Sequence, residues 1–270
     1  MQNNLHWKYL LLVRASIATH IIALCAIILA PAYWVVAVIA IVINHLILSA
    51  IGLWPRSSWL GLNWTRLPAT AVARNEIALT IDDGPDPIVT PQVLDILDAH
   101  AIKATFFCIG EKAAFHPELC REIVRRGHAI ENHSQRHPLY FSLLGPTSMR
   151  REILAGQETL TAITGQTPVF FRAPAGLRNP FLAPVLIKLG LTLASWSARG
   201  FDTQVKDPKK VSNKLLHNLR AGAILLVHDG HAALTQNGIP VIIEVLPDLL
   251  THIQTTQLRL VTLRQALLET

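Results

Sequence analysis

Two carboxylates stand side by side at Asp82 and Asp83, directly after the apolar segment 77–81. Adjacent carboxylates at the end of a strand repel each other, so the pair is unfavourable unless a cation is shared between them. A tight turn also explains the order Asp-Asp-Gly-Pro, because turns favour these residue types. Taken alone, the pair therefore indicates a turn more strongly than a metal site.

Two histidines, His133 and His137, are four residues apart and can face one point if the segment between them is helical or tightly turned. Imidazole nitrogens suit Zn²⁺ and related divalent ions, although a solvated pair of loop histidines is the simpler explanation of this spacing alone. One Asp and two His together form a facial metal site with open positions for water. The remaining Asp can then act as a base, so the joint pattern favours metal-assisted hydrolysis.

An α/β pattern surrounds these residues from position 76 onward, where short apolar segments alternate with amphipathic ones. We expect strands at 77–81, 104–109, 129–131, 169–171, 192–195, 224–227 and 258–261. We expect helices at 91–100, 117–126, 148–164, 208–219, 241–252 and 263–268. This alternation predicts a parallel sheet, and seven or so units fit a distorted (β/α)7 barrel better than a complete eightfold one.

Ionisable residues follow four of the expected strands. These are Asp82-Asp83 after the first strand, His133 and His137 after the third, Arg172 after the fourth and His228-Asp229 after the sixth. Reactive groups in barrels of this kind lie at the carboxyl ends of the strands. We therefore expect these side chains to converge on one rim.

The same four segments resemble, in order, motifs of the polysaccharide deacetylase family, also called the NodB-homology or carbohydrate esterase 4 family. They are LTIDDGP at 79–85, NHSQRHP at 132–138, RAPAG at 172–176 and LLVH at 225–228. The resemblance covers about residues 76–265 and does not extend to residues 1–75. It implies a distorted (β/α)7 barrel and a metal-dependent hydrolase that removes an N-acetyl or N-formyl group from an amino sugar in a glycan or a lipid-linked glycan precursor.

The resemblance also implies a role for each motif residue. The implied metal ligands are Asp83, His133 and His137. They would hold one divalent ion, with Zn²⁺ the first choice and Co²⁺, Mn²⁺, Fe²⁺ or Ni²⁺ compatible. Asp82 would be the general base toward the attacking water, Arg172 would orient Asp82, and His228 would be the general acid. The implied substrate-binding residues are Pro138, Leu139, Tyr140 and Trp196.

The fourth motif departs from the family pattern. Arg199 stands where the acid that partners the catalytic histidine is usual, whereas Asp202 keeps the second acidic position. We therefore expect Asp202 to partner His228, with Asp229 as the alternative. Ala175 is smaller than the residue common in the third motif, which leaves room for a different acceptor.

Other ionisable residues match no motif. The histidines expected at the surface or at helix ends are His100, His116, His128, His217, His231 and His252. Four lysines fit a solvated helix face better than a site for phosphate or anionic lipid: Lys206, Lys209, Lys210 and Lys214.

The first 75 residues differ in composition from the rest. They hold five basic residues and no Asp or Glu, whereas residues 76–270 hold the other 19 basic and all 18 acidic residues. Most of the net charge of +6 thus lies beside apolar runs without a dense basic patch, which argues against nucleic acid as a partner. A hydrophobic content of 51% excludes a disordered chain.

Two apolar runs, at about 9–30 and 32–54, are each long enough to cross a hydrocarbon core of about 30 Å, and Pro31 separates them. We expect two transmembrane helices within residues 1–56, an interfacial linker at 57–75 and a catalytic domain at 76–270. The alternatives are a signal peptide in the first run and a buried helical pair.

Basic residues flank this pair of helices on both outer sides, and the turn between them is uncharged. The positive-inside tendency then predicts a multi-pass protein of a bacterial-type inner membrane with a cytoplasmic catalytic domain. If the first helix fails to insert, the domain lies on the periplasmic or extracellular side. A cytoplasmic domain would meet a polyprenyl-linked saccharide and membrane lipids rather than finished wall polymer.

Two other classes of function stay open. The altered fourth motif is compatible with a non-catalytic membrane-bound protein that binds sugar or acts as a scaffold on the same barrel. The same metal chemistry would also permit hydrolysis of another linear or cyclic amide. The intact Asp-Asp pair, the His-x₃-His pair and His228 argue against the non-catalytic class.

Overall fold

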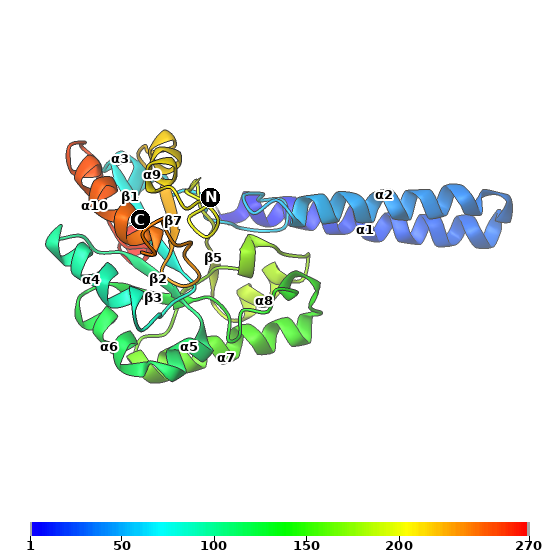
Figure 1. Ribbon diagram of the computed structural model, residues 1–270. Helices are drawn as coiled ribbons and strands as arrows, with labels where there is room; N and C mark the ends of the chain where they lie inside the picture. The colour runs from blue at the N-terminus through cyan, green and yellow to red at the C-terminus, as the bar shows by residue number, and fades with distance from the viewer. Residues whose placement is uncertain (1, 269–270) are drawn as a thin grey trace.

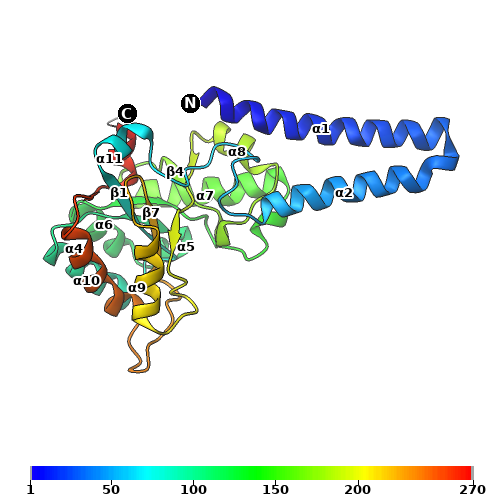
Figure 2. The ribbon, with the colours of Figure 1, turned by 90° about the horizontal axis from the view of Figure 1, so that it is seen from above.

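Two long apolar helices form a hairpin that projects from the rest of the chain (Figure 1, Figure 2). The computed structural model describes residues 2–268, with side chains from residue 11 onward. Helix α1 runs over Gln2–Leu29, a 3-10 turn covers Pro31–Tyr33, and α2 runs over Trp34–Gly52. Pro31 opens the turn between them, because it lacks the N–H that a continuing helix would need. The predicted helical hairpin is therefore confirmed, and a buried helical pair is not what the chain forms.

The side chains of the hairpin point outward. Leu29 is 82% exposed and Ile22 is 67% exposed, whereas few side chains between residues 11 and 52 are buried. Leu11–Leu29 and Pro31–Gly52 are long and apolar enough to cross a membrane, by length and composition. Such helices fit a membrane anchor or a signal sequence, because exposed apolar surface of this extent is unfavourable in water.

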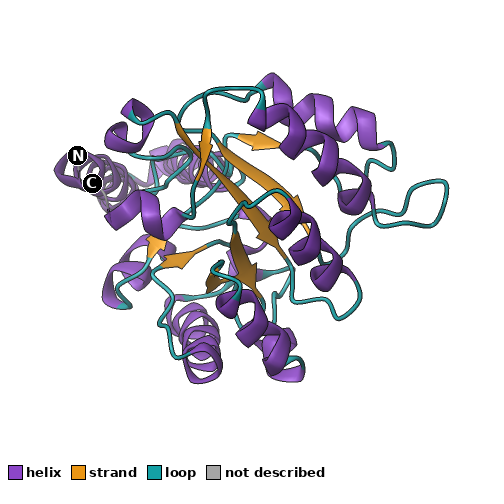
Figure 3. Cartoon of the chain, turned by 90° about the vertical axis from the view of Figure 1, so that its left-hand side faces the viewer, coloured by secondary structure: helices purple, strands orange, loops and turns teal. Residues whose placement is uncertain are grey.

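A parallel sheet of eight strands forms the centre of the remaining chain (Figure 3). The strands are β1 (Glu76–Asp82), β2 (Thr105–Cys108), β3 (Ala129–Asn132), β4 (Phe170–Phe171), β5 (Thr192–Leu193), β6 (Ala198–Arg199), β7 (Ile224–His228) and β8 (Arg259–Leu260). Seven of them follow the order β5-β4-β3-β2-β1-β7-β6, and β8 pairs with β1. Strand β1 is buried along its whole length because β2 and β7 flank it and helices cover the sheet. The predicted distorted (β/α)7 barrel is confirmed.

Helices surround this sheet, as Figure 3 shows. They are α3 (Ala69–Ala73), α4 (Val89–Ala99), α5 (Gly110–Phe115), α6 (Pro117–Arg125), α7 (Pro146–Thr164), α8 (Leu182–Lys188), α9 (Pro208–His217), α10 (Val241–Gln254) and α11 (Leu263–Leu268). Helix α4 begins two residues earlier than expected, because Asp86 Oδ1 accepts the N–H groups of Ile88 and Val89. Asp207 caps the start of α9, since its carboxylate accepts the N–H groups of Lys209 and Lys210. The short elements β6, α5 and α8 were not predicted.

Residues 57–75 are packed into the barrel. The Trp64 N–H donates to the Leu193 carbonyl at 2.9 Å, and the Trp64 carbonyl accepts from Ser195 N at 2.9 Å. Farther along, the Leu67 N–H donates to Gly222 O, just before β7. Leu67 and Ala71 are buried in the same apolar cluster as residues of the sheet. This segment thus bridges the β5 side of the sheet to β7, and its predicted place at a membrane interface stays a prediction.

Candidate active site

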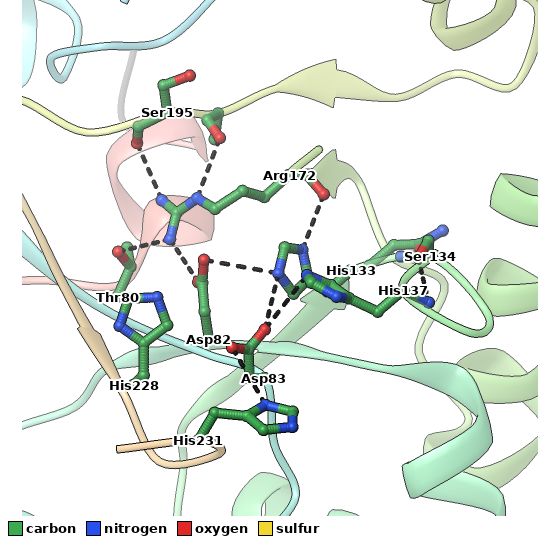
Figure 4. A network of polar contacts seen from close by, with 12 residues as sticks. Thr80, Asp82, Asp83, His133, Ser134, His137, Arg172, Ser195, His228 and His231 are labelled. Atoms are coloured by element: carbon green, nitrogen blue, oxygen red, sulfur yellow. Dashed lines mark hydrogen bonds and ion pairs between the residues drawn. The ribbon is translucent and has the colours of Figure 1, made fainter. Parts of the chain in front are cut away.

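Asp82 and Asp83 lie at the carboxyl end of β1, at the centre of the rim (Figure 4). Asp82 is the last residue of the strand, and Asp83 has a positive φ of 72°. Positive φ is unusual for a residue with a side chain and is found where surrounding structure enforces it, often at functional sites. The turn separates the two carboxylates, because Asp82 faces Arg172 and Asp83 faces the two histidines of the second motif.

A tight loop after β3 brings His133 and His137 together. The Ser134 N–H donates to the side chain of Asn132 at 2.8 Å, and Ser134 Oγ accepts the His137 N–H at 3.0 Å. Ser134 and His137 both have positive φ, which folds the segment back on itself. As a result the two imidazole centroids lie 4.7 Å apart. The segment 133–137 is therefore tightly turned. This is the geometry that the four-residue spacing requires for both rings to face one point.

One carboxylate and two imidazoles could hold a divalent ion here. Donor atoms of Asp83, His133 and His137 all lie within 4.8 Å of one another. Asp83 Oδ1 is 3.2 Å from Nε2 of His133 and 3.4 Å from Nε2 of His137. The other ring nitrogen of His133 is 2.9 Å from the Arg172 carbonyl, which fixes the tautomer with Nε2 free for a metal. The donor set therefore fits Zn²⁺ or a related ion.

The protonation states at this centre also fit a cation. Burial raises the pKa of Asp83, but the neighbouring His133 and His231 outweigh burial and hold it well below its usual range. Burial and the nearby His133 lower the pKa of His137 to about 4, so His137 is neutral and able to donate a lone pair. Burial lowers the pKa of His133, but the charges of Asp82 and Asp83 outweigh it and raise that pKa. Asp83 is thus ionised where the ligands converge, and a metal ion there would take the place of the proton that the carboxylates favour on His133.

Arg172 fixes Asp82. Its guanidinium is 1% exposed and donates to Asp82 Oδ1 at 2.6 Å and to Thr80 Oγ1 at 2.8 Å. Two backbone carbonyls, those of Ala194 and Ser195, accept its other N–H groups. A buried charge pair of this kind is favourable only when its remaining donors are also satisfied, and here they are. The second oxygen of Asp82, Oδ2, does not contact Arg172 and lies 3.8 Å from Nε2 of His133, in the lining of the cleft.

Asp202 is the partner of His228. Asp202 Oδ1 lies 2.9 Å from His228 Nδ1, and Oδ2 accepts the His228 N–H at 2.6 Å. Burial lowers the pKa of His228, but this hydrogen bond and the Asp202 charge outweigh burial and raise it. Asp229 instead accepts from Thr90 Oγ1, and burial raises its pKa to about 7. The partner of His228 is therefore Asp202, at the second acidic position of the fourth motif. The presence of Arg199 at the first position does not disrupt this pair.

A cleft of about 270 Å³ joins these groups. Its lining includes Asp82, Asp83, His133, His137, His228, Leu139, Trp196, Ala175, Arg199 and His231. Of the four residues expected to contact substrate, Leu139 and Trp196 line this cleft. Pro138 and Tyr140 line a neighbouring hollow instead.

Two polar residues at the site were missed by sequence reasoning. His231 was expected at the surface, but its Nδ1 lies 3.6 Å from Asp83 Oδ2, and its ring stays 67% exposed. Its position three residues after His228 at the end of β7 was the available signal. Lys112 donates to the Asp83 carbonyl at 2.8 Å, and no motif pointed to it. His128 was also expected at the surface, yet it is only 3% exposed and its Nδ1 accepts the Ala104 N–H.

The base of the hairpin contacts the residues that surround Arg172. The Arg178 N–H donates to the carbonyl of Gly52, the last residue of α2. Ser195 Oγ donates to the Pro55 carbonyl at 2.9 Å, while the Ser195 carbonyl accepts from Arg172. The segment that follows the hairpin is thus two hydrogen bonds away from the guanidinium that holds Asp82.

Comparison with known proteins agrees with this site. A sequence model of the polysaccharide deacetylase family matches residues 70–194. The chain is 36% identical over 174 residues to a chitooligosaccharide deacetylase of Bradyrhizobium sp. (strain ANU 289), covering 61% of this chain and 79% of that protein. It is 31% identical over 200 residues to a peptidoglycan-N-acetylglucosamine deacetylase of Bacillus cereus, covering 73% of this chain and 72% of that protein.

A solved structure shares the fold. The crystal structure of the Bc1960 peptidoglycan N-acetylglucosamine deacetylase superposes with a TM-score of 0.68 at 28% identity, covering 76% of this chain and 92% of that one. Family members are metal-dependent carbohydrate deacetylases, and the Asp83, His133 and His137 cluster is a candidate metal site of the kind that they require. The chain belongs to the polysaccharide deacetylase family.

Proposed function

We propose that this protein removes an N-acetyl or N-formyl group from an amino sugar of a glycan, with Asp82 as general base and His228 as general acid. One observation carries the proposal. Three groups of side chains lie around one cleft. They are the cluster of Asp83, His133 and His137, the Asp82–Arg172 pair and the His228–Asp202 pair. Hydrolysis of an amide needs a site that accepts a proton from water and a second site that returns a proton to the leaving amine.

Each side chain contributes a definite part. A divalent ion held by Asp83, His133 and His137 would polarise the amide carbonyl and acidify a water molecule. Asp82, held by Arg172 through one oxygen, accepts the proton of the attacking water with its other oxygen. His228 donates a proton to the nitrogen of the leaving amine, and Asp202 keeps this imidazole charged and oriented. A backbone N–H near 138–140 would stabilise the oxyanion.

The substrate we propose is an N-acylated amino sugar. The relatives are named for deacetylation of chitooligosaccharides and of peptidoglycan N-acetylglucosamine, which supports this class. We extend the proposal to a saccharide linked to a polyprenyl phosphate, because the outward-facing apolar hairpin is joined to the site through Pro55 and Ser195. Such a substrate would be presented at the height of a bilayer surface.

We propose further that α1 and α2 span a membrane and that both ends of the chain face the cytoplasm. The apolar exposure of the hairpin and the basic residues outside it support this arrangement. The catalytic domain at 76–270 would include residues 57–75 as part of its packed body. A reporter fused after the C-terminus that is active only outside the cytoplasm would contradict the cytoplasmic placement.

Acetate or formate release from N-acylated glycans tests the function. The purified chain in neutral detergent should release acid, and a chelator should abolish the release. Asp82→Asn should reduce kcat by roughly 10²–10⁴-fold, and circular dichroism checks that the variant, which leaves the Arg172 charge unpaired, is folded in the assay. Exposed Asp248 lies on α10, away from the cleft, and Asp248→Asn is the matched control. Release that is unaffected by both the chelator and Asp82→Asn would overturn the proposal, and no release from any glycan amide would favour the non-catalytic alternative.

A further inference from the structure

Arg199 is a cation in the wall of the catalytic cleft. It ends the short strand β6, which places its side chain between the cleft and helix α9. Its guanidinium carbon lies 5.4 Å from the ring centroid of Trp196 and 5.1 Å from that of Phe201. Two aromatic rings therefore hold the planar group in place, which reduces the entropy that it would lose on binding a ligand.

The charge of Arg199 has no partner among the described side chains. The carboxylates at the rim are already engaged: Asp82 by Arg172, Asp83 by His133 and the buried Asp202 by His228. No carboxylate within residues 11–268 forms an ion pair with Arg199, and its Nε is buried without an acceptor. A buried donor that lacks an acceptor is unfavourable in the free protein. The arrangement becomes favourable when an anion enters.

A second cation lies next to this position. Lys214 of α9 places its ammonium 4.8 Å from the Phe201 ring, the ring that also contacts Arg199. A second hollow of about 430 Å³ is lined by Arg199, Phe201, Lys214 and His217 among others. Arg199 thus borders both the catalytic cleft and a basic hollow beside it. A ligand that extends from one to the other must pass this guanidinium.

The Trp196 ring packs closely against the backbone of Gly176. Gly176 has a φ of 73°, and a Cβ there would lie 2.6 Å from the Trp196 ring and 2.8 Å from Pro55. Ala175 precedes it in the cleft lining and adds little bulk. This close packing holds in place the Trp196 ring, against which the Arg199 guanidinium lies.

We propose that Arg199 binds an oxyanion carried by the substrate glycan, a phosphoryl ester or a carboxylate, and so selects anionic over neutral N-acylated sugars. A guanidinium fork matches both groups through two parallel hydrogen bonds. Lys214 adds attraction from the neighbouring hollow. The inference deepens the proposed function, on which it rests for the nature of the sugar, and it makes Arg199 a specificity-determining residue for the same cleft.

Binding measurements test this independently of turnover. The full chain in neutral detergent would carry Asp82→Asn, so that ligands stay intact. Three N-acetylated oligosaccharides of one length would be titrated: a neutral one, one with a 1-phosphate and one with a uronate. The variants are Arg199→Gln, Arg199→Lys and, as a control, Lys188→Gln at an exposed position of α8. Acetate release by the same Arg199 and Lys188 variants in the otherwise unaltered chain would be measured in parallel.

The anionic ligand should bind about 10–100-fold more tightly than the neutral one, as expected for a hydrogen bond between charged groups. Arg199→Gln should remove this preference without weakening the neutral ligand, Arg199→Lys should keep part of it, and Lys188→Gln should keep all of it. Added salt should reduce only the anionic preference. If only the 1-phosphate oligosaccharide binds more tightly than the neutral one, the oxyanion that Arg199 recognises is a phosphoryl ester. If only the uronate oligosaccharide does so, the oxyanion is a carboxylate.

Two results would overturn the proposal: equal binding of neutral and anionic ligands, or an equal loss for both ligands in Arg199→Gln. The proposed function can fail separately. If Arg199-dependent anion binding occurs but no glycan amide is hydrolysed, the proposed function fails and the role of Arg199 stands. If neutral and anionic sugars are deacylated equally well, the function stands and the role of Arg199 fails.

Discussion

The rim of the barrel and the hairpin use polar groups in opposite ways. At the rim, ionisable side chains are buried and paired, with Asp82 on Arg172 and Asp202 on His228. Along the hairpin the outward surface is apolar, and the polar side chains meet between the helices, as when Asn44 donates to Ser16 Oγ at 2.9 Å. We propose that the rim carries the chemistry and that the hairpin attaches the chain to a membrane. Substitutions should affect one without the other.

The largest effect is expected from the metal ligands. His133→Ala should lower kcat/KM by at least about 10³-fold, because the ion loses a ligand and the site loses its charge balance. His252→Ala changes an exposed imidazole on α10 and should leave the rate within about twofold. Both variants should stay in the membrane fraction. Metal content by mass spectrometry and acetate release check the expectation, and full activity in His133→Ala would rule out the assigned ligand.

A smaller loss is expected when the partner of His228 is neutralised. Asp202→Asn should reduce kcat by roughly 10–100-fold. Because Asp202 raises the pKa of His228, and because His228 acts as an acid in its protonated form, activity is lost as pH rises through that pKa. The variant should therefore lose activity at a lower pH than the wild type does. Profiles of kcat/KM against pH measure this, and an unchanged alkaline limb would show that His228 is not the acid.

The boundary between the hairpin and the barrel can be located by measuring how substitutions on either side change the free energy of unfolding. Trp64 pairs with β5 and packs on Phe170, with ring centroids 5.0 Å apart, whereas Trp54 at the end of the hairpin is 56% exposed. Trp64→Ala should lower the free energy of unfolding of the barrel by about 3 kcal/mol. Trp54→Ala should change it by less than about 0.5 kcal/mol. Denaturant unfolding in detergent measures the change in the free energy of unfolding for each variant. Equal changes in Trp64→Ala and Trp54→Ala would show that residues 57–75 do not stabilise the barrel.

The smallest effect concerns a buried histidine away from the cleft. Burial and the nearby Lys103 lower the pKa of His128 to about 4, below its unfolded value of 6.5. The unfolded chain therefore takes up this proton first, and the stability contribution is complete above pH 6.5 and is lost as pH falls toward 4. His128→Asn keeps an acceptor for the Ala104 N–H and should flatten this part of the Tm profile. An identical pH slope in both proteins would contradict the assignment.

The sequence predicted most of what the rim contains, because motif residues at strand ends converge whenever the sheet is parallel. It also predicted the Asp202 partner, although Arg199 in the same motif left Asp229 as an alternative. It did not predict His231, although the spacing of three residues from His228 was a signal, nor Lys112, which reaches the site from α5 and belongs to no motif. The short strand β6 was not predicted, because two residues are too few to show a periodic pattern of apolar positions.

The role of residues 57–75 lay beyond the sequence for a different reason. Trp, Arg and Pro near an apolar run are typical of a membrane interface, and the same residues also suit an edge that closes a barrel. The choice depends on contacts with β5 and β7 that are distant in the chain. Pattern alone therefore indicated an interface, and tertiary packing places the segment against the sheet, with Leu67 and Ala71 in the buried cluster.

The proposed requirement is that the rim holds one divalent ion for the hydrolysis. It is tested most directly by removing metal from the full chain with a chelator and titrating Zn²⁺ back while acetate release from an N-acetylated glycan is followed. We predict no activity in the metal-free protein and full recovery at one equivalent, with no recovery in His137→Ala at the same concentration. Activity that persists without metal would contradict the metal requirement, and activity that returns equally in His137→Ala would contradict His137 as a ligand.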